Sequence, residues 1–434
     1  MAVRDRDDAC PGVVDATMAD DGLIARVRLP GGRIDAARLG ELAAVAREFG
    51  TGSLDLTARA NVQLRGLTDA DLPAVADALA AAGLLPTRSH DRVRNILASP
   101  LAGRDPRALV NADTVVDAID EALCASPDLA ALSGRFLIAV DDGGVPVATA
   151  RQDITLLAVA ADTFALLVAG HDTTLRVPTA RAAEAVIRTA RAFLSARASS
   201  GAWHVRELPT GAAAFAARLG GRKERVDGVD GRTGRAGRSP ETDAADGTRA
   251  RPVAASARRG DPLIGTLAQS DGRHAVGALV PLGRLTQRHV AALVALGGDV
   301  RITTTRGVVV RDVLDPVATV AALEAAGLPC DPASPWRGVT ACSGLGSCRR
   351  ASTDVRAAAT RHALSLGLAP TGRPDIGLPP TGRADLAPTN RPDSGSPSTG
   401  HPGLSLSGHP DTGPTNSGHP DTGPTNSDQP DTGP

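Results

Sequence analysis

The stretch LDLTARANVQLR, residues 54–65, has a counterpart in VRITTTRGVVVR, residues 300–311. When residue 54 is set against residue 300, the matched pairs are Leu56 with Ile302, Thr57 with Thr303, Val62 with Val308 and Arg65 with Arg311. Each stretch has the period-two pattern of a strand, and the first is expected to carry Arg59, Asn61, Gln63 and Arg65 on one face. An internal duplication predicts a pseudo-twofold body with a site between its two copies. The alternative is two unrelated split β-α-β units.

The elements around the two stretches follow the same order. In the first copy we predict a strand over 23–29, a turn at 30–32, a helix capped by Asp35 and a second helix over 69–82. In the second copy we predict a strand over 275–280, a turn at 281–283 and helices over 286–296 and 316–326. Strands that alternate with helices in this order predict an α+β fold.

Composition changes divide the chain into seven parts. Residues 219–261 are rich in Gly, Arg and Asp without apolar periodicity, so they are predicted to form a flexible linker. The end of the chain repeats GHPDTGPTNS and is predicted to be disordered, because such a composition cannot bury a core. The expected parts are an N-terminal segment (1–20), a first half-repeat (21–88), a central α+β domain (89–218), the linker (219–261), a second half-repeat (262–330), a truncated cluster-binding domain (331–368) and the repeat tail (369–434).

The composition excludes several classes of protein. A net charge of −1 over 434 residues provides no field that would favour nucleic acid or an anionic membrane. No apolar run is long enough to span a bilayer, and the charged start lacks the apolar stretch of a secretory signal. The five cysteines are sparse for a disulfide framework, which favours a reducing, cytoplasmic location.

Two cysteines stand in the small-residue stretch VTACSGLGSCRR, residues 339–350. Cys342 and Cys348 are candidate metal ligands, because iron–sulfur clusters are held by cysteine thiolates. A cubane cluster needs four cysteines, and this motif supplies two. The alternative is a pair of reduced thiols in an ordinary loop.

These motifs together resemble the sulfite/nitrite reductase superfamily. The resemblance rests on TARANVQLRG (57–66), Arg94-Asn95, Thr305-Arg306-Gly307 and ACSGLGSC (341–348). Within the superfamily, ACPG (9–12) and SPWRG (334–338) are similar to the precorrin-3B synthases of aerobic cobalamin biosynthesis. The resemblance implies two ferredoxin-like half-repeats and a central α+β domain around a tetrapyrrole site.

The resemblance also implies a substrate site and a reaction. The residues expected to bind the carboxylates of an anionic tetrapyrrole, precorrin-3A, are Thr57, Arg59, Asn61, Gln63, Arg65, Arg94, Asn95, Arg135 and Arg306. The expected reaction is an O2-dependent hydroxylation with lactone formation. It would use a 4Fe-4S cluster, a non-haem iron and NADH, with an electron-donor protein as a possible partner. No residues are assigned as catalytic or as ligands of the non-haem iron.

Two departures leave other functions open. The second cysteine pair of the superfamily, a C-x3-C, is absent after Cys348, and Leu137 stands where sulfite reductases carry a cation. The alternatives are a sirohaem-dependent sulfite or nitrite reductase and a degenerate chain that binds a tetrapyrrole without catalysis.

Overall fold

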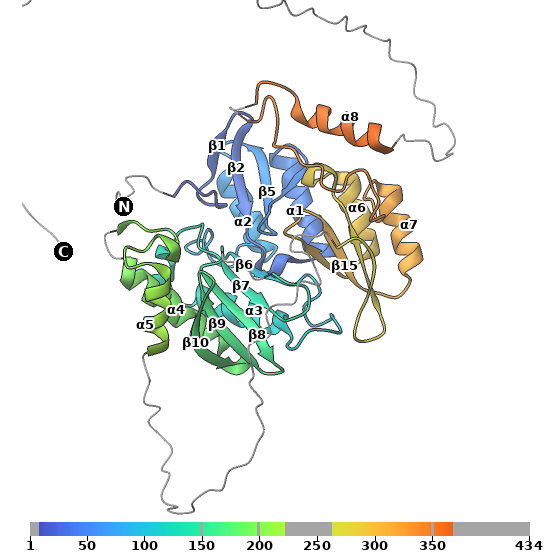
Figure 1. Cartoon of the computed structure of the whole chain (residues 1–434). Coiled ribbons are helices and arrows are strands. Elements are labelled where there is room, and N and C mark those ends of the chain that lie inside the picture. Colours follow the sequence, from blue (N-terminus) through green and yellow to red (C-terminus); the bar gives the residue numbers. More distant parts are fainter. Residues whose placement is uncertain (1–7, 148–150, 198–199, 222–262, 349–350, 368–434) are drawn as a thin grey trace, which may run out of the picture. The chain divides into compact units, whose positions relative to one another are not determined.

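A computed structural model describes residues 8–147, 151–197, 200–221, 263–348 and 351–367 (Figure 1). Nearly all of the predicted linker and tail lies outside these residues. In the described part, three five-stranded sheets carry the fold, and no helix is both long and apolar enough to cross a membrane.

The first sheet contains the first of the duplicated stretches. Its strand order is β1-β2-β5-β4-β13, all antiparallel, and two helices accompany it. The bounds are β1 (Thr17–Ala19), β2 (Gly22–Val27), β4 (Leu54–Leu56), β5 (Val62–Leu67), β13 (Arg284–Leu285), α1 (Ala36–Phe49) and α2 (Leu72–Ala81). Asp35 caps α1 as predicted, because its side chain accepts a hydrogen bond from the Arg38 amide at 2.7 Å.

The second sheet contains the second stretch in the same arrangement. Its strand order is β11-β12-β15-β14-β3, again antiparallel. The bounds are β11 (Gly265–Ala268), β12 (His274–Ala278), β14 (Asp299–Ile302), β15 (Val308–Val313), β3 (Arg33–Asp35), α6 (Gln287–Leu296) and α7 (Pro316–Ala326). Gly327 ends α7 in the left-handed conformation, at φ 94°.

The two copies exchange their edge strands. β3 belongs to the first copy by sequence but pairs with β14, and β13 belongs to the second copy but pairs with β4. Each strand follows a short 3-10 turn, Pro30–Gly32 or Pro281–Gly283. Each sheet is therefore completed by a strand from the other copy.

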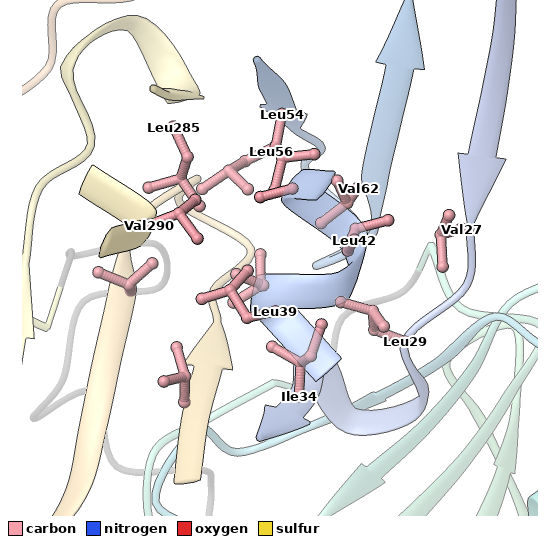
Figure 2. Close-up of a cluster of buried hydrophobic side chains, with 14 of the residues drawn as sticks. Val27, Leu29, Ile34, Leu39, Leu42, Leu54, Leu56, Val62, Leu285 and Val290 are labelled. Carbon is pink, nitrogen blue, oxygen red and sulfur yellow. The ribbon is translucent and has the colours of Figure 1, made fainter. Parts of the chain in front are cut away.

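One hydrophobic core serves both copies. Figure 2 shows Leu285 and Val290 of the second copy beside Leu54, Leu56 and Leu39 of the first. Leu39, Leu54 and Leu285 are fully buried. The predicted internal duplication is thus present as two interlocked ferredoxin-like halves.

The prediction of one continuous strand over 54–65 is wrong. Residues 57–61 form a tight turn between β4 and β5, in which the Asn61 amide donates to Thr57 Oγ1 at 3.1 Å and Ala60 has φ 55°. The second copy repeats the turn: the Gly307 amide donates to Thr303 Oγ1 at 2.9 Å. The turn breaks the period-two alternation, so the predicted four-residue polar face does not form.

The third sheet lies between the two copies in sequence and is mixed, with order β10-β9-β8-β7-β6. Its bounds are β6 (Ile96–Ala98), β7 (Ile138–Asp141), β8 (Ile154–Ala160), β9 (Thr163–Val168) and β10 (His171–Pro178), with helices α3 (Ala112–Cys124), α4 (Ala182–Arg197) and α5 (Ala212–Gly221). Short 3-10 turns occur at Pro127–Ala131, Thr179–Arg181 and Val205–Glu207, and α8 (Val355–Gly367) follows the cysteine loop.

Candidate anion site and cysteine loop

Strand β2 ends in Arg26-Val27 and Arg28 follows it, and the alternation of the extended chain separates these side chains. Val27 is fully buried in the core, whereas Arg26 and Arg28 reach the N-terminal segment around Cys10. Arg28 is only 2% exposed, and its guanidinium donates to the carbonyls of Pro11 at 3.1 Å and Arg92 at 3.2 Å.

The third cation comes from the turn between β4 and β5. Arg59 Nη1 donates to the Gly134 carbonyl at 3.3 Å, and the Cys10 thiol donates to the same oxygen at 3.3 Å. Cys10 Sγ also accepts from Arg26 Nη1 at 3.2 Å and from Arg28 Nη2 at 3.5 Å. Arg26, Arg28 and Arg59 therefore form one group around Cys10, which we call the arginine cluster.

The arginine cluster has an excess of positive charge. None of its three members forms an ion pair with a carboxylate in the described part of the chain, and Arg26 Nε is buried without a hydrogen-bond partner there. Burial lowers the pKa of each guanidinium, that of Arg28 to about 10, so all three stay protonated at neutral pH. Asp8, Asp91 and Asp153 oppose this lowering without forming ion pairs with the three guanidiniums, so the cations stay incompletely neutralised and the site is suited to an anionic ligand.

Three of the predicted site residues instead build the frame beneath the cluster. Asn61 Oδ1 accepts from the Leu29 amide at 2.9 Å, and Asn61 Nδ2 donates to Asn95 Oδ1 at 3.2 Å. Asn95 Nδ2 donates to the Gly134 carbonyl at 3.0 Å, while Thr57 closes its own turn. These side chains support the turn that carries Arg59, and their hydrogen bonds are made to other groups of the protein.

Two predicted arginines are already neutralised. Arg94 makes two hydrogen bonds to Asp120, at 2.7 and 2.6 Å. Burial opposes the charge of Arg94, but Asp120 outweighs it and raises the pKa of this guanidinium. Arg65 makes a similar pair with Asp21, at 2.9 and 2.8 Å. Neither Arg65 nor Arg94 belongs to the arginine cluster, and each is neutralised by its aspartate.

The last two predicted arginines lie in different settings. Arg135 is exposed, 3.3 Å from Asp8 and stacked over the ring of Trp203 at 5.0 Å. Arg306 occupies the turn of the second copy at φ 61°, beside Gly283, and its side chain makes no hydrogen bond or ion pair with any described residue. Arg306 is therefore free to bind a ligand, but no contact joins it to the arginine cluster.

A polar row connects the cluster to the opposite edge of the first sheet. The strand register places Arg26, Gln63, Asp55 and Arg284 side by side across β2, β5, β4 and β13. Arg284 pairs with Asp55 at 2.6 and 3.0 Å. Gln63, predicted to bind substrate, therefore lies next to Arg26 in this row.

The cysteine loop is fixed to the same sheet. Arg65 Nη2 donates to the Ser347 carbonyl at 2.7 Å, and Ser343 Oγ donates to the same oxygen at 3.1 Å. Gly344 and Gly346 have φ of 85° and 81°, which lets the loop turn tightly. Cys342 is exposed and Cys348 is half-buried, so both ends of the loop are accessible.

Comparisons with known proteins agree with this architecture. Residues 17–82 match the model of the nitrite/sulfite reductase ferredoxin-like half domain. Over 380 residues the chain is 28% identical to the ferredoxin–nitrite reductase of Synechococcus elongatus, which covers 79% of this chain and 69% of that protein. The chain is thus similar to members of the sulfite/nitrite reductase superfamily, in one ferredoxin-like half domain by the family model and over most of its length by the nitrite reductase.

Two further matches bear on this likeness. A precorrin-3B synthase from Sinorhizobium is 32% identical over 136 residues, or 31% of this chain and 29% of that protein. The solved structure of the Mycobacterium tuberculosis NirA protein superposes with a TM-score of 0.59 at 22% identity, covering 79% of this chain and 64% of NirA. The NirA likeness shows the fold, and the Synechococcus nitrite reductase matches more of the chain than the precorrin-3B synthase does.

The superfamily uses an iron–sulfur cluster and sirohaem, and the two fit this chain unequally. The arginine cluster suits the carboxylates of a tetrapyrrole. The described residues contain no group of three or more Cys, His, Asp or Glu side chains arranged to hold a metal. The described residues therefore do not bring together four thiolates for such a cluster.

Proposed function

We propose that the arginine cluster binds the carboxylates of an anionic tetrapyrrole, and that the chain acts as an oxidoreductase on that group. The observation that carries the proposal is Arg28, a cation with 2% of its surface exposed and no carboxylate partner among the described residues. A carboxylate or other oxyanion held by the less buried Arg26 and Arg59 would balance this charge, since guanidinium groups bind such anions through hydrogen bonds.

The reaction that the relatives favour is reduction of nitrite or sulfite with sirohaem. The ferredoxin–nitrite reductase match runs through 79% of this chain. Both substrates are small anions, so the charge that holds the macrocycle would also attract them. When bound, sirohaem supplies the iron at which such an anion is reduced. Arg26, Arg28 and Arg59 would hold and orient the anionic groups.

Precorrin-3B synthesis is the second candidate, and one observation favours it. The superfamily resemblance places a second cation at position 137, but Leu137 is 7% exposed and packs in the hydrophobic core. Arg135 alone remains on this segment as a surface cation. A site with fewer cations at this point suits a large organic substrate better than sirohaem with an additional anion.

The experiment that tests the proposal measures tetrapyrrole binding directly. Sirohaem and uroporphyrin would be titrated into the purified chain and followed by absorbance. Arg59→Gln should raise the dissociation constant about tenfold or more, because a charge-assisted hydrogen bond contributes about 1.5–3 kcal/mol. The matched control is Arg176→Gln on β10, which removes an exposed arginine that is paired with Asp172.

The outcomes separate the two candidates. Nitrite or sulfite reduction by the sirohaem-loaded protein, with reduced methyl viologen as donor, would support the reductase. Conversion of precorrin-3A with O2 and NADH would support the synthase. Equal binding by wild type, Arg59→Gln and the Arg176→Gln control would refute the anion site itself.

A further inference from the structure

A buried carboxylate and a buried histidine form a pair just before β8. Asp153 is 1% exposed and His204 is 6% exposed, and His204 Nδ1 donates to Asp153 Oδ2 at 3.0 Å. Two backbone amides fix the carboxylate: that of Leu137 donates to Oδ2 at 2.9 Å, and that of Val205 donates to Oδ1 at 2.8 Å. An ionised carboxylate only accepts hydrogen bonds, so Asp153 sets the orientation of the imidazole ring.

The second ring nitrogen of His204 is left open. Its Nε2 makes no hydrogen bond with a described residue and is not among the fully buried polar atoms that lack a partner, so a ligand or solvent can reach it. The buried His90, in contrast, uses both ring nitrogens, on Ser89 Oγ and on the Ser126 carbonyl, each at 2.9 Å. A ring held by a carboxylate at Nδ1 and open at Nε2 is arranged to transfer a proton.

This pair adjoins the arginine cluster through the short segment 134–137. The Gly134 carbonyl at its start accepts from Arg59 at 3.3 Å, and the Leu137 amide at its end donates to Asp153. Burial lowers the pKa of Arg59, and Asp153 lies close enough to oppose that shift. The histidine pair and the cluster therefore belong to one neighbourhood.

A second contact joins His204 to the same segment. Arg135 stacks over the ring of Trp203, the preceding residue, at 5.0 Å. Glu207 Oε2 accepts from the amides of Trp203 at 2.9 Å and His204 at 3.3 Å, which fixes the backbone here. Burial and, to a smaller extent, Arg135 lower the pKa of Arg59, so Arg135 also lies near the cluster.

We propose that His204 donates protons to an oxyanion held at the arginine cluster, and that Asp153 is the residue that positions its ring. This inference rests on the proposed reduction of nitrite or sulfite at that site. The proton on Nε2 passes to an oxygen of the anion, whose bond to nitrogen or sulfur breaks, and the oxygen leaves as water with a second proton from solvent. A low-potential one-electron donor supplies a pair of electrons for each oxygen removed, and solvent returns a proton to Nε2.

One measurement follows the His204 ring without any turnover. The chain is prepared with isotope-labelled histidine, and the His204 resonance is identified by its loss in His204→Asn. Added uroporphyrin should shift this resonance with the dissociation constant that absorbance gives, about tenfold weaker in Arg59→Gln. The exposed His171 on β10 should not shift. Binding that leaves His204 unmoved would overturn this inference and leave the anion site intact, whereas absence of binding would overturn both.

Variants separate a proton donor from a structural histidine. His204→Asn keeps an N–H group for Asp153 but has no proton to transfer. In the sirohaem-loaded protein, with reduced methyl viologen as donor, its kcat should fall about a hundredfold or more while KM changes little. Asp153→Asn should also lower kcat, because the ring loses its orientation. The matched control His171→Gln should keep the wild-type rate.

Chemical rescue completes the test of His204. Free imidazole should restore part of the rate of His204→Ala and should leave the rate of His171→Gln unchanged. A kcat of His204→Asn within about twofold of wild type, or no rescue by imidazole, would overturn the inference while the proposed reaction stands. Tetrapyrrole binding without any reduction by wild type would overturn the proposed reaction and this inference with it.

Discussion

Replacing Gly32 with alanine should disrupt the exchange of strands between the two copies. Gly32 has φ +68° and directly precedes β3, and an added Cβ would lie 2.2 Å from the carbonyl oxygen of Ile302 in β14. Real Cβ atoms do not approach below 3.0 Å, and the obstacle here is backbone, so β3 must move away from β14. We expect a loss of about 3–5 kcal/mol in the free energy of unfolding, because lost strand pairing adds to backbone strain.

Two control glycines separate the contributions. Gly52→Ala introduces a residue at φ +75° with nothing within 4 Å, so it should cost only the strain of about 1–2 kcal/mol. Gly283→Ala is the equivalent change in the second copy. Its added Cβ would lie 3.0 Å from Cδ and 3.2 Å from Cβ of Arg306, so its cost should lie between those of Gly52→Ala and Gly32→Ala.

Urea unfolding followed by circular dichroism measures the three losses, and hydrogen exchange shows where the structure opens. Amides of β3 and β14 should exchange faster in Gly32→Ala, while those of the central sheet stay unchanged. Losses that agree within about 0.5 kcal/mol for Gly32→Ala and Gly52→Ala would refute the argument from close approach.

Three further substitutions have defined outcomes. Burial raises the pKa of Asp142 to about 7, so ionising this carboxyl opposes folding. Between pH 5 and pH 8 the free energy of unfolding of wild type should fall by about 2–3 kcal/mol, whereas that of Asp142→Asn should not. Urea unfolding midpoints at the two pH values measure both changes. Arg94→Met leaves Asp120 without its partner and should lower the free energy of unfolding by about 2–4 kcal/mol. Adding Asp120→Leu should recover most of that loss, and a double mutant as unstable as the single mutant would contradict this reasoning. Burial lowers the pKa of His289, whose ring accepts from the Thr286 amide at 3.2 Å as neutral imidazole. That hydrogen bond is present above pH 6.5 and is lost when the ring is protonated on acidification. His289→Gln should therefore reduce the loss in free energy of unfolding at acid pH by about 1 kcal/mol, and a pH dependence of stability equal to that of wild type would exclude this capping role.

Much of the fold could be predicted from the sequence, because its signals are local. Asp35 is a standard helix cap, Gly327 a standard helix end, and the match of Thr57 with Thr303 identified the duplication. The hairpin turns were missed because Ala60 and Arg306 occupy positive-φ positions where glycine or asparagine would signal a turn. The exchanged strands are only two and three residues long, and no sequence periodicity identifies so short an element.

The candidate site was predicted in part. Arg59 was identified from the sequence, whereas Arg26 and Arg28 were not, although they alternate with the buried Val27 at the end of a predicted strand. The ion pairs of Arg65 and Arg94 could not be predicted, since their partners Asp21 and Asp120 become neighbours only in the folded chain. A sequence shows which residues carry charge, but the fold determines which charges remain unpaired.

The exchanged edge strands have a consequence for assembly. A half-repeat produced alone would have an unpaired sheet edge and a detached strand, β3 or β13, that fits only its counterpart. Two such fragments could complete their sheets only by association, at a rate and extent that depend on their concentration. Joining both halves in one polypeptide makes that encounter intramolecular, so the completed sheets persist at any dilution.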